Sequence, residues 1–206
     1  MFIMILTATL TAYGNADTLA IRTMLNKASA TLFHEDSGLI YSREALRLSK
    51  EAASDKFISL SLQQIAYFYL KKENYGKATE HYLEALKIEE QQNNKKRMAA
   101  LEEYIAYVYC MMEDFNISMD YYQKALAVYT AEKDSLSLVR ILRGIGKLYD
   151  EREFCEPRDS AQKTGDFRTA ISYFTRSAEM SAKIGNSDGY YLARINIGNT
   201  LRKLEK

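Results

Sequence analysis

Few residues of this sequence have the types and the spacing that catalysis or metal binding requires. His34 and His81 each lack a second ligand type at metal-binding spacing, so we expect them to be structural or surface residues. Cys110 and Cys155 form neither a C-x-x-C pair nor a cysteine–histidine arrangement. These observations predict no metal site and no cysteine nucleophile.

The two cysteines leave one structural question open. In an exported protein, a disulfide between Cys110 and Cys155 would tie the segment around Cys155 to the helix that carries Cys110. The alternative, which we favour, is a reduced and partly buried Cys110.

Two further patterns resemble chemical sites without meeting their requirements. The stretch 144–147, Gly-Ile-Gly-Lys, has the residue types of a phosphate loop but lacks the spacing and follows no predicted strand. The carboxylate pairs Glu89-Glu90 and Glu102-Glu103 are expected on solvated helix faces. The sequence therefore predicts no cofactor and no enzymatic activity.

An internal repeat defines the elements that position the remaining side chains. The motif Ile65-Ala66-x-x-Tyr69 recurs 40 residues later as Ile105-Ala106-x-x-Tyr109. In the same way, Ala78-x-x-x-Tyr82-x-x-Ala85 recurs as Ser118-x-x-x-Tyr122-x-x-Ala125. A fixed period of this length is typical of a solenoid, in which each unit buries its core against its neighbours.

Polar capping residues occur twice in each period, which indicates two helices per repeat. One series precedes an aromatic residue: Asn74, Asp114 and Asp166. The other begins the alternate helices: Ser54, Asn94, Asp134 and Asn186. The expected helices cover residues 17–34, 39–53, 55–71, 74–91, 94–112, 115–131, 134–152, 166–184 and 187–204, with a turn at 35–38.

One repeat is longer than the others. The step from Ser118 to its counterpart Ala170 is 52 residues instead of 40. The extra residues fall at about 153–165 and include Pro157, the only proline of the chain. An insertion between two helices of one repeat is expected to be a surface loop.

These residues resemble the tetratricopeptide repeat (TPR) family in its long, 40-residue variety, similar to kinesin-light-chain-type and bacterial regulatory arrays. The family's small crossing residues match Ala66, Ala106, Gly146 and Gly198, then Ala78, Ser118 and Ala170; its aromatic fillers match Tyr69, Tyr109 and Tyr149, then Tyr82, Tyr122 and Phe174. The resemblance covers about residues 17–206. It implies an all-α fold, a right-handed α-solenoid of antiparallel helix pairs with about four and a half repeats.

The family also implies binding of a protein or peptide along the face that the first helix of each repeat lines. The matching positions run from apolar and aromatic to basic: Leu60, Gln63, Tyr67, Glu103, Tyr107, Arg140, Arg143, Lys147, Asn199 and Arg202. We therefore expect a peptide partner with an acidic half. The alternative is that Leu60, Tyr67 and Tyr107 simply pack between repeats. The family's clamp for a C-terminal carboxylate is not matched, because Thr23 and Lys27 occupy the required positions.

Composition and the two chain ends complete the expectations. The net charge of +1 predicts no strong attraction to nucleic acid or to an anionic membrane. Residues 1–16 are uncharged and fit the apolar part of a secretory signal, with Gly14 and Ala16 before a cut at Asp17. We expect an exported, periplasmic protein; the alternatives are a cytoplasmic protein and an N-terminal apolar helix that caps the solenoid.

The C-terminal edge carries Ile195, Ile197, Leu201 and Leu204. Three interpretations stay open: a longer array, a homo-oligomer formed through this edge, or a last helix that acts as the cap. The leading hypothesis for function is a non-catalytic binding scaffold, such as the sensory or interaction part of a bacterial regulator. The alternative is a structural subunit that self-associates through the C-terminal edge.

Overall fold

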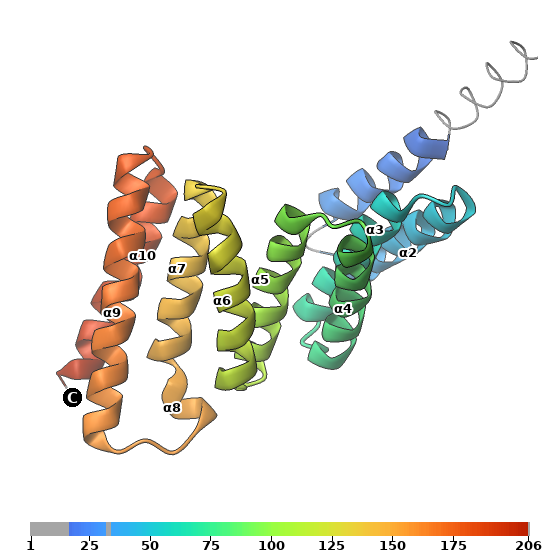
Figure 1. The fold of residues 1–206 in the computed structure, drawn as a ribbon. Helices are drawn as coiled ribbons and strands as arrows, with labels where there is room; N and C mark the ends of the chain where they lie inside the picture. The colour runs from blue at the N-terminus through green and yellow to red at the C-terminus, as the bar shows by residue number, and fades with distance from the viewer. Residues whose placement is uncertain (1–16, 32–33, 206) are drawn as a thin grey trace, which may run out of the picture. The chain divides into compact units, whose positions relative to one another are not determined.

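The computed structural model describes residues 17–31 and 34–205. All regular secondary structure in this part of the chain is helical (Figure 1). The predicted signal segment, residues 1–16, lies outside the described residues. None of the described helices is long and apolar enough to cross a lipid bilayer.

The chain divides into two compact units, Met1–Asn94 and Lys95–Lys206. In unit 1, residues 17–30 are helical and are followed by α2 (Glu35–Glu51), α3 (Asp55–Lys71) and α4 (Tyr75–Gln91). A buried cluster of Ile21, Leu25, Ala45 and Phe57 joins the N-terminal helix to α2 and α3. Each amphipathic helix thus buries its apolar stripe against the next helix along the chain.

Unit 2 contains α5 (Lys95–Met111), α6 (Phe115–Ala131), α7 (Ser135–Asp150), α8 (Arg152–Cys155), α9 (Ser160–Lys183) and α10 (Ser187–Leu204). Figure 1 shows these helices side by side, with α9 and α10 at one end of the unit. A buried cluster joins α5, α6 and α7 and includes Ala106, Tyr122 and Ile145. The all-α solenoid of helix pairs expected from the repeat is confirmed.

The helix pairs α3/α4, α5/α6 and α7/α9 repeat the same contacts, one period apart. Ring stacking joins Tyr69 to His81, Tyr109 to Tyr121 and Tyr149 to Tyr173, with centroids 5.6, 6.1 and 5.9 Å apart. Two serines of second helices, at different repeat positions, also donate a hydrogen bond to a carbonyl of the first helix: Ser118 to Ala106 and Ser177 to Val139.

Most predicted caps are confirmed. The side chains of Asn74, Asp114, Asp134 and Asn186 each accept a hydrogen bond from the backbone N–H three residues later. Ser54 precedes α3 without a side-chain cap bond. Asp166 was predicted to cap its helix, and this is wrong: α9 begins six residues earlier, at Ser160, with Asp159 and Gln162 forming a capping box.

The structure of the inserted segment explains why Asp166 does not cap α9. The segment was predicted to be a surface loop, but it contains the short helix α8 and the first turn of α9. Asp166 is buried and accepts hydrogen bonds from Arg158 Nε at 2.9 Å and from Arg152 at 3.4 Å. Arg152 also lies 3.8 Å from the centroid of the Phe115 ring. The insertion therefore brings its own cations to the carboxylate.

Two smaller expectations are also corrected. Residues 35–38, predicted as a turn, form the first turn of α2. Glu89, predicted to be solvated, is buried and accepts a hydrogen bond of 2.6 Å from the Ser59 hydroxyl. A buried carboxylate is tolerated when hydrogen-bond donors satisfy it.

Candidate functional site

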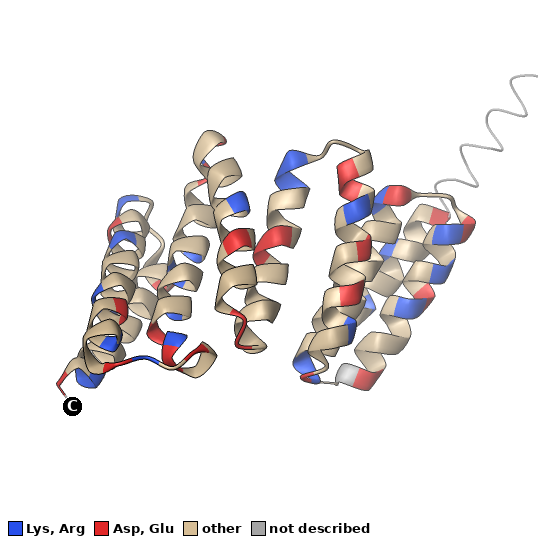
Figure 2. Cartoon of the chain, turned by 60° about the horizontal axis from the view of Figure 1, so that its bottom comes forward, with Lys and Arg blue, Asp and Glu red and all other residues tan. Residues whose placement is uncertain are grey.

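The ten predicted binding residues all lie on the first helices of the pairs and on α10, and they fall into three groups. Figure 2 shows that Lys and Arg are interspersed with Asp and Glu along the helices, so no unit carries a single sign of charge. The three groups differ in the contacts that their side chains make.

The first group lies in unit 1 on α3. Leu60 packs against the buried cluster of Ile21 and Phe57, so it contributes at least in part to the core. Gln63 and Tyr67 are partly exposed, and the Tyr67 ring meets the Phe68 ring edge-on at 5.6 Å. Packing between helices, the alternative to ligand binding, thus describes Leu60 better than Gln63 and Tyr67.

The second group is brought together in unit 2 between α5 and α7. We call it the α5–α7 face and define it by Glu103, Tyr104, Tyr107, Arg140, Arg143 and Lys147. Glu103 accepts from Arg140 Nε at 3.1 Å and from Arg140 Nη2 at 3.0 Å. The Tyr129 hydroxyl, from α6, donates to the same carboxylate at 2.9 Å. A two-point arginine–carboxylate contact of this kind fixes both side chains.

These contacts satisfy the charge of Arg140. Burial lowers the pKa of Arg140, but the hydrogen bonds and charge of Glu103 outweigh this effect and the pKa lies above its ordinary value. Burial and the neighbouring Glu103 charge also raise the pKa of Tyr129. Tyr129 therefore stays a neutral donor across the physiological range.

Arg143 is in a different situation. Its side chain is half-buried one turn along from Arg140, and no acidic residue of the described chain forms an ion pair with it. Burial lowers the pKa of Arg143, and the positive charge of Arg140 lowers it further, while Glu103 acts in the opposite direction. An arginine stays protonated in proteins, so this is a partly desolvated cation without a counter-ion.

Two tyrosines of α5 lie on the same face. Tyr104 and Tyr107 are 39% and 38% exposed. The ammonium of Lys147 lies 5.7 Å from the centroid of the Tyr107 ring and 3.8 Å from the Glu151 carboxylate. The α5–α7 face thus offers exposed rings, one unpaired cation and one loosely paired cation on neighbouring helices.

The third group lies on α10. Arg202 and Asn199 are both exposed and contact each other. Next to them, Lys203 donates to the Asp150 carboxylate at 2.8 Å, and the Thr200 hydroxyl donates to the same carboxylate at 2.8 Å. These bonds join α10 to α7 and leave Arg202 without an acidic partner in the described chain.

Sequence reasoning missed two members of the site. Tyr104 lies next to Glu103 but falls outside the four positions per helix that the family resemblance selects. Tyr129 comes from a second helix, which the resemblance assigns to the opposite side. Tyr129 is 40 residues after Glu89, and both residues are buried and hydrogen-bonded to the first helix of their own pair. This shared role is visible only in the structure, because the two residue types differ.

Cavities of unit 2 that lie outside the α5–α7 face include the following two. One, of about 210 Å³, is lined by Cys110, Met111, Glu113, Leu148, Glu151, Phe154 and Cys155. Both thiols are free; burial raises the pKa of Cys110 to about 12 and also raises that of Cys155. These raised pKa values favour the protonated thiols at neutral pH over the thiolate, which is the nucleophilic form. No group of three or more potential metal ligands occurs in the described part of the chain.

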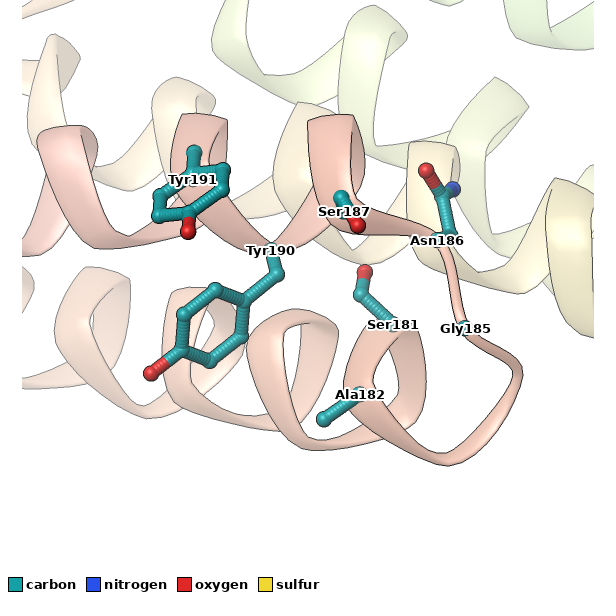
Figure 3. A pocket seen from close by; sticks show the side chains of 7 residues that line it. All are labelled: Ser181, Ala182, Gly185, Asn186, Ser187, Tyr190 and Tyr191. Carbon is teal, nitrogen blue, oxygen red and sulfur yellow. The ribbon is translucent and has the colours of Figure 1, made fainter.

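The other cavity, of about 220 Å³, lies at the turn between α9 and α10 (Figure 3). Ser181, Asn186, Tyr190 and Tyr191 are among the residues that line it. The buried Ser181 hydroxyl has no hydrogen-bond partner among the described residues. Ser181 occupies the repeat position of Tyr129, so a small side chain leaves space where a tyrosine fills it in the preceding pair.

Comparisons with known proteins add the fold relationship. No family model matches the sequence, and no curated protein matches it. The structure is similar to BtubC (BKLC) from P. vanneervenii, with a TM-score of 0.52 and 13% identity over 95% of this chain and 92% of that chain. It is also similar to the apo form of RapI, with a TM-score of 0.60 and 18% identity over 94% and 72% of the two chains. The structural neighbours are TPR-type repeat proteins, and at these identities the likeness is one of fold.

Proposed function

We propose that the protein is a non-catalytic scaffold that binds an extended peptide segment on the α5–α7 face through an acidic side chain of that peptide. The observation that carries the proposal is Arg143, a half-buried guanidinium with no acidic partner in the described chain. Desolvating a cation without a counter-ion is unfavourable, and an incoming carboxylate would offset that cost.

The surroundings of Arg143 favour a peptide over a free anion. Tyr104 and Tyr107 expose ring surface on the α5–α7 face, and tyrosine and arginine are the residue types that most often carry binding energy at protein interfaces. An acidic residue next to an apolar or aromatic residue would use both features. Such a module would serve as the ligand-sensing or interaction part of a larger system.

The test is an array of short synthetic peptides that differ in their content of glutamate and of leucine or phenylalanine, probed with the purified full chain. We expect binding only to peptides that carry both residue classes. Replacing both cations, Arg143→Glu with Lys147→Glu, should weaken this binding at least about tenfold, because losing a partly buried charge pair costs about 2 kcal/mol or more.

The matched control is Lys124→Glu on α6. Lys124 has the same kind of contact as Lys147, with its ammonium 4.8 Å from the centroid of the Tyr121 ring, but it is not part of the α5–α7 face. We expect the control to bind like the unmodified protein. Equal binding by the double variant, or equal loss in the control, would contradict the proposal.

A further inference from the structure

The insertion between α7 and α9 forms one wall of a cavity in unit 2. In the pairs α3/α4 and α5/α6 the two helices are joined by the short turns 72–74 and 112–114. After α7 the chain continues into α8 instead, and Phe154 and Cys155 of this helix line the cavity of about 210 Å³ that both cysteines share. We call it the α8 cavity. Its other lining residues come from α5, from α7 and from the turns that follow them.

The wall of the α8 cavity is mostly apolar. Met111, Leu148 and Phe154 line it, and the free thiols of Cys110 and Cys155 add surface that behaves as a small apolar group. An apolar cavity of about 150 Å³ engineered into another protein binds benzene. The α8 cavity, at about 210 Å³, therefore has room for an aromatic ring with a short alkyl chain.

The charged residues that line this cavity, Glu113 and Glu151, are both acidic. Glu113 forms no ion pair with any residue of 17–31 and 34–205. Glu151 lies 3.8 Å from the ammonium of Lys147, which is a loose ion pair, and burial raises the pKa of Glu151 above its ordinary value. A cation in the cavity would offset the unfavourable desolvation of this carboxylate.

Two further cations near Glu151 are bound to other carboxylates. Arg152 donates to Glu156 at 2.7 Å, and Lys203 donates to Asp150 at 2.8 Å. Neither can neutralise the acidic residues of the cavity without giving up these hydrogen bonds. Charge complementarity therefore favours a cationic ligand over a neutral or an anionic one.

We propose that the α8 cavity binds a small-molecule amine in its protonated form, with a short chain joining the ammonium to an aromatic ring. The ring would lie against Leu148 and Phe154, and the ammonium would lie beside Glu113 and Glu151. None of the residues that define the α5–α7 face lines this cavity. The amine site is therefore separate from the proposed peptide site.

A lysine side chain of a partner protein offers the same charge but is a poorer occupant. Its stem is straight and unbranched, so it would leave part of the space lined by Met111, Leu148 and Phe154 unfilled. Unfilled apolar space loses van der Waals contacts, whereas an aromatic ring buries a large area.

Cys155 provides a readout inside the cavity, because it is partly exposed whereas Cys110 is buried. The probe is phenethylamine, added in increasing concentration to the purified full chain. The rate at which methyl methanethiosulfonate modifies Cys155 is followed by mass spectrometry at mildly alkaline pH, where the reactive thiolate forms and the amine stays protonated. We expect saturable slowing of this modification below about 10 mM phenethylamine.

Matched ligands test the requirement for charge. Phenethyl alcohol and phenylacetate carry the same ring without a positive charge, so each should protect Cys155 at least about threefold more weakly than phenethylamine. A blocked lysine, with its α-amino and carboxyl groups capped, represents the side chain of a partner protein. It should also protect more weakly, because it lacks the ring.

Variants of the chain test the residues of the cavity. Replacing both acids, Glu113→Gln with Glu151→Gln, should weaken protection at least about threefold. The matched control is Glu153→Gln, because Glu153 also belongs to α8 but pairs with Lys163 at 2.8 Å and does not line the cavity. The control should be protected like the unmodified chain. Protection is the ratio of rates with and without probe for each variant, so altered exposure of the thiol does not affect it.

Four results would overturn the inference: no protection at about 10 mM phenethylamine, equal protection by phenethyl alcohol, equal protection in the variant that lacks both acids, and stronger protection by the blocked lysine. The last result would make a lysine side chain the occupant. Arg143→Glu should leave the protection unchanged, so failure of this inference and failure of the proposed function are distinguishable.

Discussion

At the scale of single residues, Arg140 and Arg143 of the α5–α7 face differ in their ionic partners, and the proposed function depends on this contrast. The two arginines lie one turn apart on α7. Glu103 and Tyr129 form a network that satisfies Arg140, whereas Arg143 has no acidic partner in the described chain. This network is partly exposed, since the Arg140 side chain is 48% exposed, and it leaves no carboxylate oxygen of Glu103 in an ion pair with Arg143.

Asp166 allows a direct test of how buried charges support the insertion. The carboxylate accepts two hydrogen bonds from Arg158, at 2.9 and 3.1 Å. We expect Asp166→Ala to lower the free energy of unfolding by about 2–4 kcal/mol, because it leaves partly buried cations without their anion. Urea unfolding followed by circular dichroism measures the change.

The control for this prediction is Glu156→Gln. Glu156 pairs with Arg152 at 2.7 Å, but its side chain is 42% exposed. Exposed ion pairs contribute about 0–1 kcal/mol, so the control should change stability little. A loss below about 1 kcal/mol for Asp166→Ala would show that the insertion does not depend on this carboxylate.

Residue-scale predictions from the sequence were the weakest. Asp166 has the residue type and period of a helix cap, and only the arginines of the insertion turn it into a buried acceptor. The residue type of Glu89 predicts a surface position, but in the structure the Ser59 hydroxyl donates a hydrogen bond to its buried carboxylate. The partner of Asp166 lies 8 residues away and that of Glu89 lies 30 residues away, and a pattern of residue types does not show that either pair meets.

At the scale of helices and turns, the sequence was far more informative. The predicted ranges 55–71, 115–131 and 187–204 coincide with α3, α6 and α10. Caps and apolar periodicity are local signals, so they locate helix ends without knowledge of the tertiary structure. The insertion broke the period, and there the prediction placed the start of α9 six residues too late.

The turns between helices contain a feature that the sequence did not reveal. Ala53, Glu73, Asn93, Glu113 and Lys133 have positive φ, as does Gly185 at the corresponding place after α9. Left-handed backbone favours glycine, yet five of these six turns use other residues. No compositional signal marks them, because the conformation is imposed by the helices on either side.

This difference predicts opposite effects for two substitutions at one repeat position. Lys133→Gly should stabilise the protein by about 0.5–1 kcal/mol, because it relieves the left-handed strain at φ 54°. Gly185→Ala should destabilise it by about 1 kcal/mol, although no atom lies within 4 Å of the added Cβ. Urea midpoints measure both changes, and a common sign would contradict the explanation.

At the scale of the whole molecule, the period of the sequence predicted which helices pair. It also predicted five of the residues that define the α5–α7 face, but not Tyr104. It did so because a solenoid is built from nearest-neighbour contacts that recur along the chain. It could not predict which charges of that face stay unpaired, since this depends on Tyr129 from the second helix and on side-chain geometry. The structural neighbours support the fold alone. The class of ligand has to be inferred from the side chains of this chain.

The central claim is that Arg143 recognises an acidic side chain, and a charge-swap titration tests it most directly. The affinity of one glutamate-containing peptide from the array is measured for the unmodified chain and for Arg143→Glu, each against the same peptide with its glutamate replaced by lysine. We predict that Arg143→Glu loses at least about tenfold in affinity for the glutamate peptide and regains a comparable factor with the lysine peptide. A variant that binds the glutamate peptide normally, or that gains nothing from the lysine peptide, would contradict the claim.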